Sequence, residues 1–200
     1  MQGICFIEPL VGATVEGRKT MTRRIMAPQP PAGAHLRNVS DELLSDRKTW
    51  KRRAHFSNGT EASPKYSVGE VLYLKEPYRL DNRGHIFYKF ALKDREPDGW
   101  KNKLFMPASA ARYFIRITGI GEERLQDIAP EDCIKEGVRA TSGNILYFSG
   151  AEKKPTAYPY PRECYAALID IAAGRGTWDS NPFVWVYDYE FLPDYKISAL

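Results

Sequence analysis

Short runs of apolar residues separated by polar, glycine-rich or proline-rich segments dominate the chain, and this pattern predicts several short strands with few helices. The clearest strand is expected at residues 183–192 (FVWVYDYEFL), where aromatic and β-branched residues cluster. Residues 71–75 (VLYLK) predict a buried strand, and residues 111–120 alternate in the manner of a half-buried strand. Further strands are expected at residues 4–7 and 85–90, the latter joined to the strand at 71–75 by a polar connection.

Proline and glycine mark the ends of the predicted helices. The first helix is expected to run from Pro9 to about Glu16, with Gly17 as its C-terminal cap. A short second helix covers residues 130–136 and ends before a glycine, and a third covers residues 162–173, where apolar residues recur at helical spacing.

Two segments interrupt this pattern and are interpreted as insertions, at about residues 27–65 and 139–161. The first begins with APQPPAGAH and ends with SNGTEASP, which are both turn-forming. Between them, Asp41–Arg53 is expected to form a helix with Ser40 as its N-cap. Five or so strands, short helices and long loops together predict one α+β domain over residues 1–200, built on a small β-barrel.

The composition is that of a globular protein, since 43% of the 200 residues are hydrophobic and 27% are charged. No stretch approaches the roughly 18 apolar residues that a membrane span needs. The three cysteines have no CxxC spacing, which argues against a disulfide framework or a zinc ribbon. These features predict a reduced, cytoplasmic protein that does not associate with membranes.

The net charge of +4 is concentrated in the first third of the chain. Residues 1–65 hold 11 Lys and Arg against 6 Asp and Glu, whereas residues 66–200 hold 18 against 19. This excess fits a polyanionic partner or a solvated basic surface, and both interpretations remain open.

A cluster of cations around Trp50 provides candidate nucleic-acid-binding residues, because it combines charges for phosphates with one ring for stacking. Its members are Arg47, Lys48, Lys51, Arg52 and Arg53. The alternative is a solvated helix face.

Several catalytic chemistries lack their motifs in this sequence. The three histidines are far apart and outside any zinc-binding pattern, so no metal and no cofactor is expected. Residues 12–20 (GATVEGRKT) nearly match a phosphate-binding loop, but an extra arginine precedes the lysine, and a helix leads into the segment instead of following it. Zinc-deaminase and serine-hydrolase signatures are absent as well.

The basic segment GRKTMTRR, residues 17–24, is the strongest candidate site. Neighbouring guanidinium groups disfavour an ammonium, so Lys19 is a candidate general base. Thr22 supplies a hydroxyl that needs such a base to become a nucleophile. The same charges also fit a plain basic turn that contacts phosphates or solvent.

The spacing Gly17-x-Lys19-x-x-Thr22-x-Arg24 resembles the GxKxxTxR signature of the ASCH domain, a branch of the PUA-like superfamily. The resemblance also covers VLYLKEP, residues 105–138 and the closing NPFVWVYDYEF, which is similar to the end of larger phage and prophage members. Together with the leading IEPLVGATVEGRKTMTRRI, these blocks cover 71 of the 200 residues, in the right order. They imply a PUA-like small β-barrel with flanking helices, long loop insertions and a cleft into which the motif projects.

Small bacterial members similar in these motifs are amidohydrolases that remove the acetyl group from N4-acetylcytidine. The resemblance therefore implies a modified nucleoside or RNA as the partner, and catalytic roles for Lys19, Thr22 and Glu76. A non-catalytic reader of RNA or modified bases is the alternative, and a ribonuclease is a third interpretation.

Substrate contacts are expected from Gly17, Arg23 and Arg24 of the motif and from Tyr78, an aromatic residue suited to stacking on a base. Arg24 is the leading donor to an oxyanion or phosphate, because a guanidinium presents a bidentate fork. Glu76 has a structural alternative, an ion pair with Arg24.

Overall fold

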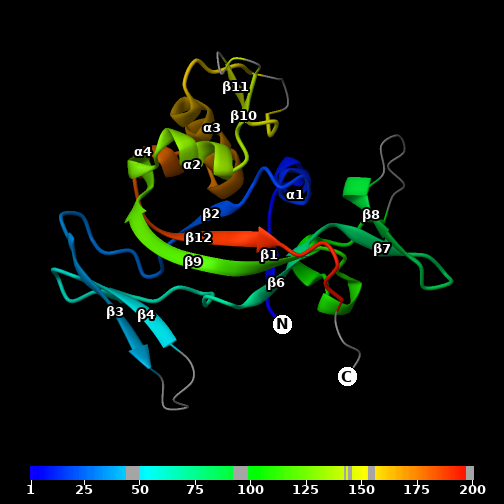
Figure 1. The fold of residues 1–200 in the computed structure, drawn as a ribbon, viewed down its shortest axis with the longest axis horizontal. Coiled ribbons are helices and arrows are strands. Elements are labelled where there is room, and N and C mark those ends of the chain that lie inside the picture. The colour runs from blue at the N-terminus through cyan, green and yellow to red at the C-terminus, as the bar shows by residue number, and fades with distance from the viewer. Residues whose placement is uncertain (44–49, 92–98, 142, 144–145, 153–155, 197–200) are drawn as a thin grey trace.

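The chain has a mixed α+β fold, with mostly strands and few helices (Figure 1). The computed structural model describes residues 1–43, 50–91, 99–141, 143, 146–152 and 156–196. Within this part of the chain, no helix is long and apolar enough to cross a membrane.

A five-stranded sheet with the order β1-β6-β9-β12-β2 forms the centre of the fold. Its strands are β1 (Gly3–Cys5), β2 (Met21–Ile25), β6 (Val71–Lys75), β9 (Phe114–Arg124) and β12 (Phe183–Phe191). Strand β1 is parallel to β6, and the other neighbours are antiparallel.

The apolar runs in the sequence account for the central strands. Strand β12 is buried along most of its length, as the prediction for residues 183–192 requires, and the strand at 71–75 is confirmed as β6. Strand β9 begins at Phe114 and continues to Arg124, so it lies further along the chain than predicted.

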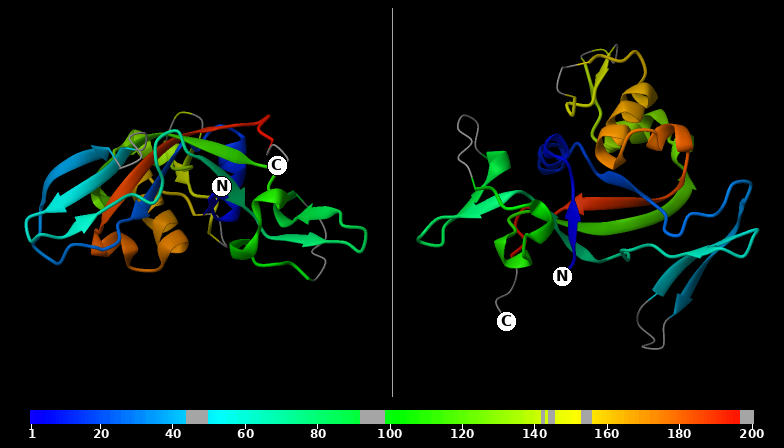
Figure 2. Two further views of the ribbon diagram at one scale, coloured as in Figure 1. Left: turned by 90° about the horizontal axis from the view of Figure 1, so that it is seen from below. Right: turned by 180° about the vertical axis from the view of Figure 1, so that it is seen from behind.

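The helices gather on one side of the sheet (Figures 1 and 2). They are α1 (Glu8–Val15), α2 (Pro130–Lys135), α3 (Pro161–Ala173) and α4 (Thr177–Ser180). A proline stands in the first turn of each of the first three, which confirms the three helices expected from the sequence. Their buried residues, such as Leu10 of α1 and Cys164 and Leu168 of α3, pack with the sheet in one core.

The predicted helix over Asp41–Arg53 is wrong. Its described residues, 41–43 and 50–53, lie in a second, three-stranded sheet of β3 (Leu36–Leu43), β4 (Trp50–Phe56) and β5 (Glu61–Ala62). Asp41 pairs with Arg52 across β3 and β4, and Ser40 pairs with Arg53. Opposite charges placed directly across an antiparallel pair favour the hairpin, and a helix-cap argument does not detect them.

The expected polar connection between the strands at 71–75 and 85–90 is also corrected. Strand β7 (Tyr78–Leu80) intervenes and pairs with β8 (Ile86–Tyr88), while β6 pairs only with strands of the central sheet. This second hairpin and the hairpin β3–β4 project from opposite ends of the central sheet (Figures 1 and 2).

The segment at 139–161 contains a small sheet in place of a plain loop. Strand β10 (Arg139–Ala140) pairs with β11 (Tyr147–Phe148), and both lie near the helices (Figure 1). Short 3-10 helices complete the fold: η1 (Lys89–Ala91), η2 (Lys103–Phe105), η3 (Ala108–Ala110) and η4 (Leu125–Asp127).

Candidate functional site

A pocket of about 250 Å³ brings together Lys19, Thr22, Arg23 and Arg24 of the basic motif. The walls come from β2, the ends of α1 and α2, and one face of α3. Its polar lining residues include Lys19, Thr22, Arg23, Arg24, Lys103, Glu136 and Tyr165. We call this space the motif pocket.

The junction between α1 and β2 positions the motif. Gly17 has φ +75°, a left-handed conformation that ends the helix without strain. The amides of Arg18 and Lys19 both donate to the carbonyl oxygen of Ala13, at 2.9 Å. Gly17 itself is exposed and does not line the motif pocket, so its structural role is that of a helix cap.

Lys19 is buried, with 1% of its surface exposed. Its Nζ donates to the carbonyl oxygens of Met21 (2.6 Å) and Glu136 (2.9 Å) and to Glu136 Oε2 (2.6 Å). Burial lowers the pKa of Lys19 below its ordinary value, and the Glu136 carboxylate opposes this shift only in part. The amine and the carboxylate therefore form a close buried pair.

Arg23 fixes the other side of the Glu136 carboxylate. Its guanidinium contacts Glu123 (2.6 Å), Asp132 (3.2 Å) and Glu136 Oε1 (3.2 Å). Burial by itself lowers the pKa of Arg23, but the Glu136 and Glu123 carboxylates raise it above its usual value, so the side chain remains charged. Arg23 is thus committed to a buried ion network that orients Glu136.

Thr22 lies on β2 between these two cations and lines the motif pocket. It is 4% exposed, and among the described residues none makes a hydrogen bond with its hydroxyl. The candidate nucleophile Thr22 is therefore held on a strand at the pocket, and its hydroxyl has no partner among the described residues.

Arg24 connects the two edge strands of the central sheet. Its Nη2 donates to the carbonyl oxygen of Cys5, at 2.8 Å, and its guanidinium carbon lies 5.5 Å from the ring centre of Phe6. Within the described part of the chain it has no carboxylate partner, so its charge is available to an anion.

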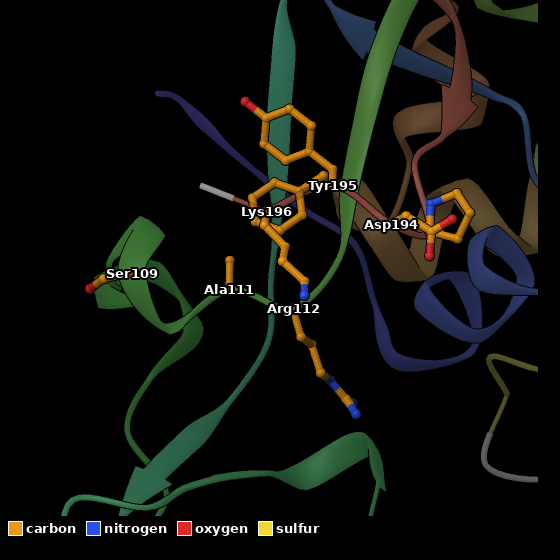
Figure 3. Close-up of a pocket in the computed structure, with 8 residues that line it drawn as sticks. Ser109, Ala111, Arg112, Asp194, Tyr195 and Lys196 are labelled. Atoms are coloured by element: carbon orange, nitrogen blue, oxygen red, sulfur yellow. The ribbon is translucent and has the colours of Figure 1, made fainter. Parts of the chain in front are cut away.

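Glu76 does not line the motif pocket. Its carboxylate is fully buried and accepts two hydrogen bonds from Arg112, at 2.9 and 2.7 Å. Glu76 therefore forms a structural ion pair, but with Arg112 and not with Arg24 as the sequence alternative expected. Arg112 also lines a separate pocket of about 830 Å³ beside Asp194 and Tyr195 (Figure 3).

Tyr78 also lies outside the motif pocket. It is 6% exposed and packs in a small apolar cluster with Met106 and Ala110. Its ring is covered by these neighbours, so the structure does not bring Tyr78 to the motif residues.

The basic cluster around Trp50 is only partly covered by the described residues, because Arg47 and Lys48 lie outside them. Arg52 pairs with Glu122 at 3.0 Å and with Asp41 at 3.6 Å. In the same sheet, Arg53 contacts Glu42 and Glu61, whereas Lys51 is exposed. Two of the three described cations are thus neutralised within the fold.

Sequence reasoning missed Glu136 and Tyr165. Glu136 caps the C-terminal end of α2, where a carboxylate interacts unfavourably with the helix dipole. That unfavourable position is the feature of the sequence that could have identified Glu136 as a functional residue. Tyr165 is 1% exposed, and its buried hydroxyl lacks a partner among the described residues. No sequence pattern distinguishes this tyrosine from an ordinary core residue of α3.

Comparisons with protein-family models, with curated proteins and with solved structures found no match. The function must therefore be argued from the site itself. Among the described residues, no group of three or more His, Cys, Asp or Glu side chains is placed to hold a metal ion.

The motif pocket combines groups that suit acyl-transfer chemistry: a free hydroxyl, a buried amine–carboxylate pair and an unpaired guanidinium. A hydroxyl nucleophile needs a base, a developing oxyanion needs a donor, and a leaving amine needs an acid. The Tyr165 hydroxyl, by contrast, is fully buried and lacks a partner among the described residues, although buried phenols usually have one.

Proposed function

We propose that this chain is an ASCH-type protein that hydrolyses an N-acyl amide on a cytosine-type base in the motif pocket. The observation that carries the proposal is the unbonded Thr22 hydroxyl in the same pocket as the buried Lys19–Glu136 pair. The resemblance of the GxKxxTxR motif supports the choice of substrate.

A PUA-like barrel is part of the same proposal. Strands β1 and β2 are the two edges of the central sheet, yet one arginine side chain spans the gap between them. Edges that approach so closely are what a sheet curling toward closure requires.

The Lys19–Glu136 pair carries the proton transfers in this mechanism. A buried pair can exist as ammonium and carboxylate or, with the same number of protons, as amine and carboxylic acid. In the second form, Lys19 Nζ accepts the proton of the Thr22 hydroxyl as Oγ1 attacks the acyl carbon. Glu136 then donates its proton to the leaving amine nitrogen of the base as the amide bond breaks.

These transfers leave an ester between Thr22 and the acyl group, with the pair as ammonium and carboxylate. Water attacks the ester and gives one proton to Glu136, while Lys19 returns its proton to Thr22 Oγ1. Acid and enzyme are released with the pair restored. Arg24 stabilises the oxyanion in both steps, because its charge is not neutralised by a carboxylate.

This assignment gives Glu136 the role that the resemblance assigns to Glu76. Both carboxylates are buried, but Glu136 lines the motif pocket and Glu76 is held by Arg112. We therefore expect Glu76→Gln to retain turnover and Glu136→Gln to lose it, each measured at a temperature where circular dichroism shows the variant folded.

A non-catalytic reader of modified bases is the second candidate. It is favoured by one observation, since all three protons of the Lys19 ammonium have acceptors. In that case the pocket would bind its base without chemistry.

Incubation with N4-acetylcytidine, followed by chromatography for cytidine, separates the two candidates. Turnover by the parent protein, its loss in Thr22→Val and its recovery in Thr22→Ser would support the hydrolase, because only the hydroxyl variants keep a nucleophile. Binding without turnover would support the reader. Substantial turnover by Thr22→Val would overturn Thr22 as the nucleophile.

A further inference from the structure

A second pocket of about 490 Å³ adjoins the motif pocket, and the two share Arg24 and Cys5 as lining residues. Cations and aromatic rings dominate its polar lining. We call this space the cationic pocket.

Three cations line the cationic pocket: Arg24, Lys65 and Lys75. None of its lining residues carries a carboxylate, and within the described part of the chain none of the three cations forms an ion pair. Lys75 is held in place by a hydrogen bond from its Nζ to the carbonyl oxygen of Leu104, at 2.8 Å. Concentrated positive charge without counter-charge is the electrostatic signature of an anion site.

The aromatic residues of this pocket keep its charge positive. A tyrosine is ordinarily neutral near pH 7, and burial raises the pKa of Tyr66 and, to about 12, that of Tyr187, so neither phenol adds negative charge there. The Tyr187 hydroxyl also accepts a hydrogen bond from the amide of Lys65, at 3.0 Å, which fixes the backbone beside that cation.

Trp185 leaves a buried polar group unsatisfied at the wall of the cationic pocket. It lines the cationic pocket, is 2% exposed, and its indole N–H lacks a hydrogen-bond partner in the described part of the chain. A buried indole N–H normally has an acceptor. Trp185 lies directly opposite Arg24 in the pairing of β12 with β2, so an acceptor here would also lie close to a cation.

We propose that the cationic pocket binds a phosphate group attached to the nucleoside whose base occupies the motif pocket. The shared position of Arg24 places an anion in one pocket next to a base in the other. The identity of the base rests on the proposed function, but the phosphate site does not.

Calorimetric titrations with cytidine, cytidine 5′-monophosphate and a cytidylyl dinucleotide test this inference. We expect at least one phosphorylated ligand to bind about tenfold or more tightly than cytidine, since one charge-assisted hydrogen bond contributes that much. An advantage for the mononucleotide indicates a terminal phosphate, and an advantage for the dinucleotide alone indicates an internal phosphodiester.

Matched variants localise the effect. Lys65 is exposed, so Lys65→Ala is a mild change. This variant and the double variant Lys65→Ala/Lys75→Ala should bind phosphorylated ligands no more tightly than cytidine. Their affinity for cytidine itself should be unchanged. Lys51 on β4 lines neither pocket, so Lys51→Ala should still bind phosphorylated ligands more tightly than cytidine. An advantage that survives in the double variant would overturn the inference.

Alkylation of Cys5 with iodoacetamide reports on the site without any nucleoside. Pyrophosphate should slow the alkylation in the parent protein and not in the double variant. If pyrophosphate protects Cys5 but no cytidine ligand binds, the proposed base is wrong and the phosphate site stands. If cytidine binds, and neither phosphate advantage nor protection is found, the phosphate site is overturned and the proposed function stands.

Discussion

Arg24 and Cys5 connect the two edges of the central sheet through one hydrogen bond, from Nη2 of Arg24 to the carbonyl oxygen of Cys5 at 2.8 Å. The same two residues line both the motif pocket and the cationic pocket. The contact therefore stabilises the fold and forms the boundary between the two candidate sites.

Arg24→Gln tests this double role. Loss of a hydrogen bond from a charged donor should lower the free energy of unfolding by about 1.5–3 kcal/mol, measured by urea denaturation. Arg37→Gln is the matched control, because Arg37 is exposed and lines neither pocket. Equal stability of the two variants would show that the hydrogen bond between Arg24 and Cys5 contributes nothing to the free energy of unfolding.

Gly137 follows α2 and lies against Leu10 and Lys19, where an added side chain would be strained. Its φ is +109°, and a Cβ there would lie 2.7 Å from Leu10 Cδ2. Gly137→Ala should thus destabilise the protein by about 1–3 kcal/mol more than Gly33→Ala. Gly33 also has a positive φ, of +82°, but a Cβ there meets nothing within 4 Å. Thermal melting of both variants makes the comparison, and equal melting temperatures would contradict it.

Glu136→Gln should be strongly destabilising, because it leaves the ammonium of Lys19 buried without its carboxylate. Breaking a buried ion pair costs about 3–5 kcal/mol, whereas Asp132→Asn, at a partly exposed partner of Arg23, should cost about 1 kcal/mol or less. Denaturant unfolding of the two variants measures both costs.

The loss caused by Glu136→Gln should also depend on pH. Burial lowers the pKa of Lys19, so the folded protein binds fewer protons than the unfolded chain between that pKa and the ordinary value of 10.5. The contribution of Lys19 to stability accordingly rises with pH across this range. Removing the Glu136 carboxylate lowers the pKa of Lys19 further, so the pH range over which stability rises begins at a lower pH. The destabilisation should be smaller at about pH 10 than near neutral pH, and a larger loss at high pH would contradict this account.

Much of the fold could be predicted because the strands are strongly apolar. The sequence of β12 is almost continuous in aromatic and β-branched residues, and the prolines and glycines around α1 and α2 mark helix ends by their fixed backbone preferences. The hairpin β3–β4 could not be recognised in this way, because its stability depends on pairs such as Asp41 with Arg52 that form only across strands.

The candidate site was predictable where it is local in sequence. Lys19, Thr22 and Arg24 fall within one turn and one strand, so their spacing brings them together. Glu136 reaches Lys19 across 117 residues of chain, and Glu76 finds Arg112 instead of the motif. Such pairings depend on how α2 packs against β2, and the spacing of residues along the chain does not predict that packing.

Thiol chemistry should distinguish the three cysteines. Burial raises the pKa of Cys133 and of Cys164 to about 12, whereas Cys5 is half-buried and lines both pockets. At about pH 8, only roughly one in ten thousand of the buried thiols would be thiolate, the reactive form. Iodoacetamide should label Cys5 alone in the folded protein and all three cysteines after denaturation, as read by mass spectrometry.

The raised pKa values of Cys133 and Cys164 also determine whether stability rises or falls with pH. Between pH 9 and 12 the unfolded chain loses protons that the folded state retains, so the two thiols make stability fall as the pH rises.

Rapid labelling of Cys133 or Cys164 in the folded protein would show that the core around α2 and α3 opens easily.

The hairpin β3–β4 provides a prediction that separates nucleic-acid contacts from structural ion pairs. Arg52 and Arg53 have carboxylate partners, so replacing either by alanine should leave RNA affinity nearly unchanged, and Arg52→Ala should lower stability by up to about 1 kcal/mol. Lys51 is exposed, so Lys51→Ala should reduce the salt-dependence slope for single-stranded RNA by about 0.7 if that side chain contacts a phosphate. Fluorescence anisotropy over a salt series measures each slope. A large fall in the slope on replacing Arg52 would mean that the ion pair with Glu122 opens to release a cation for phosphate, and the hairpin would then belong to the binding surface.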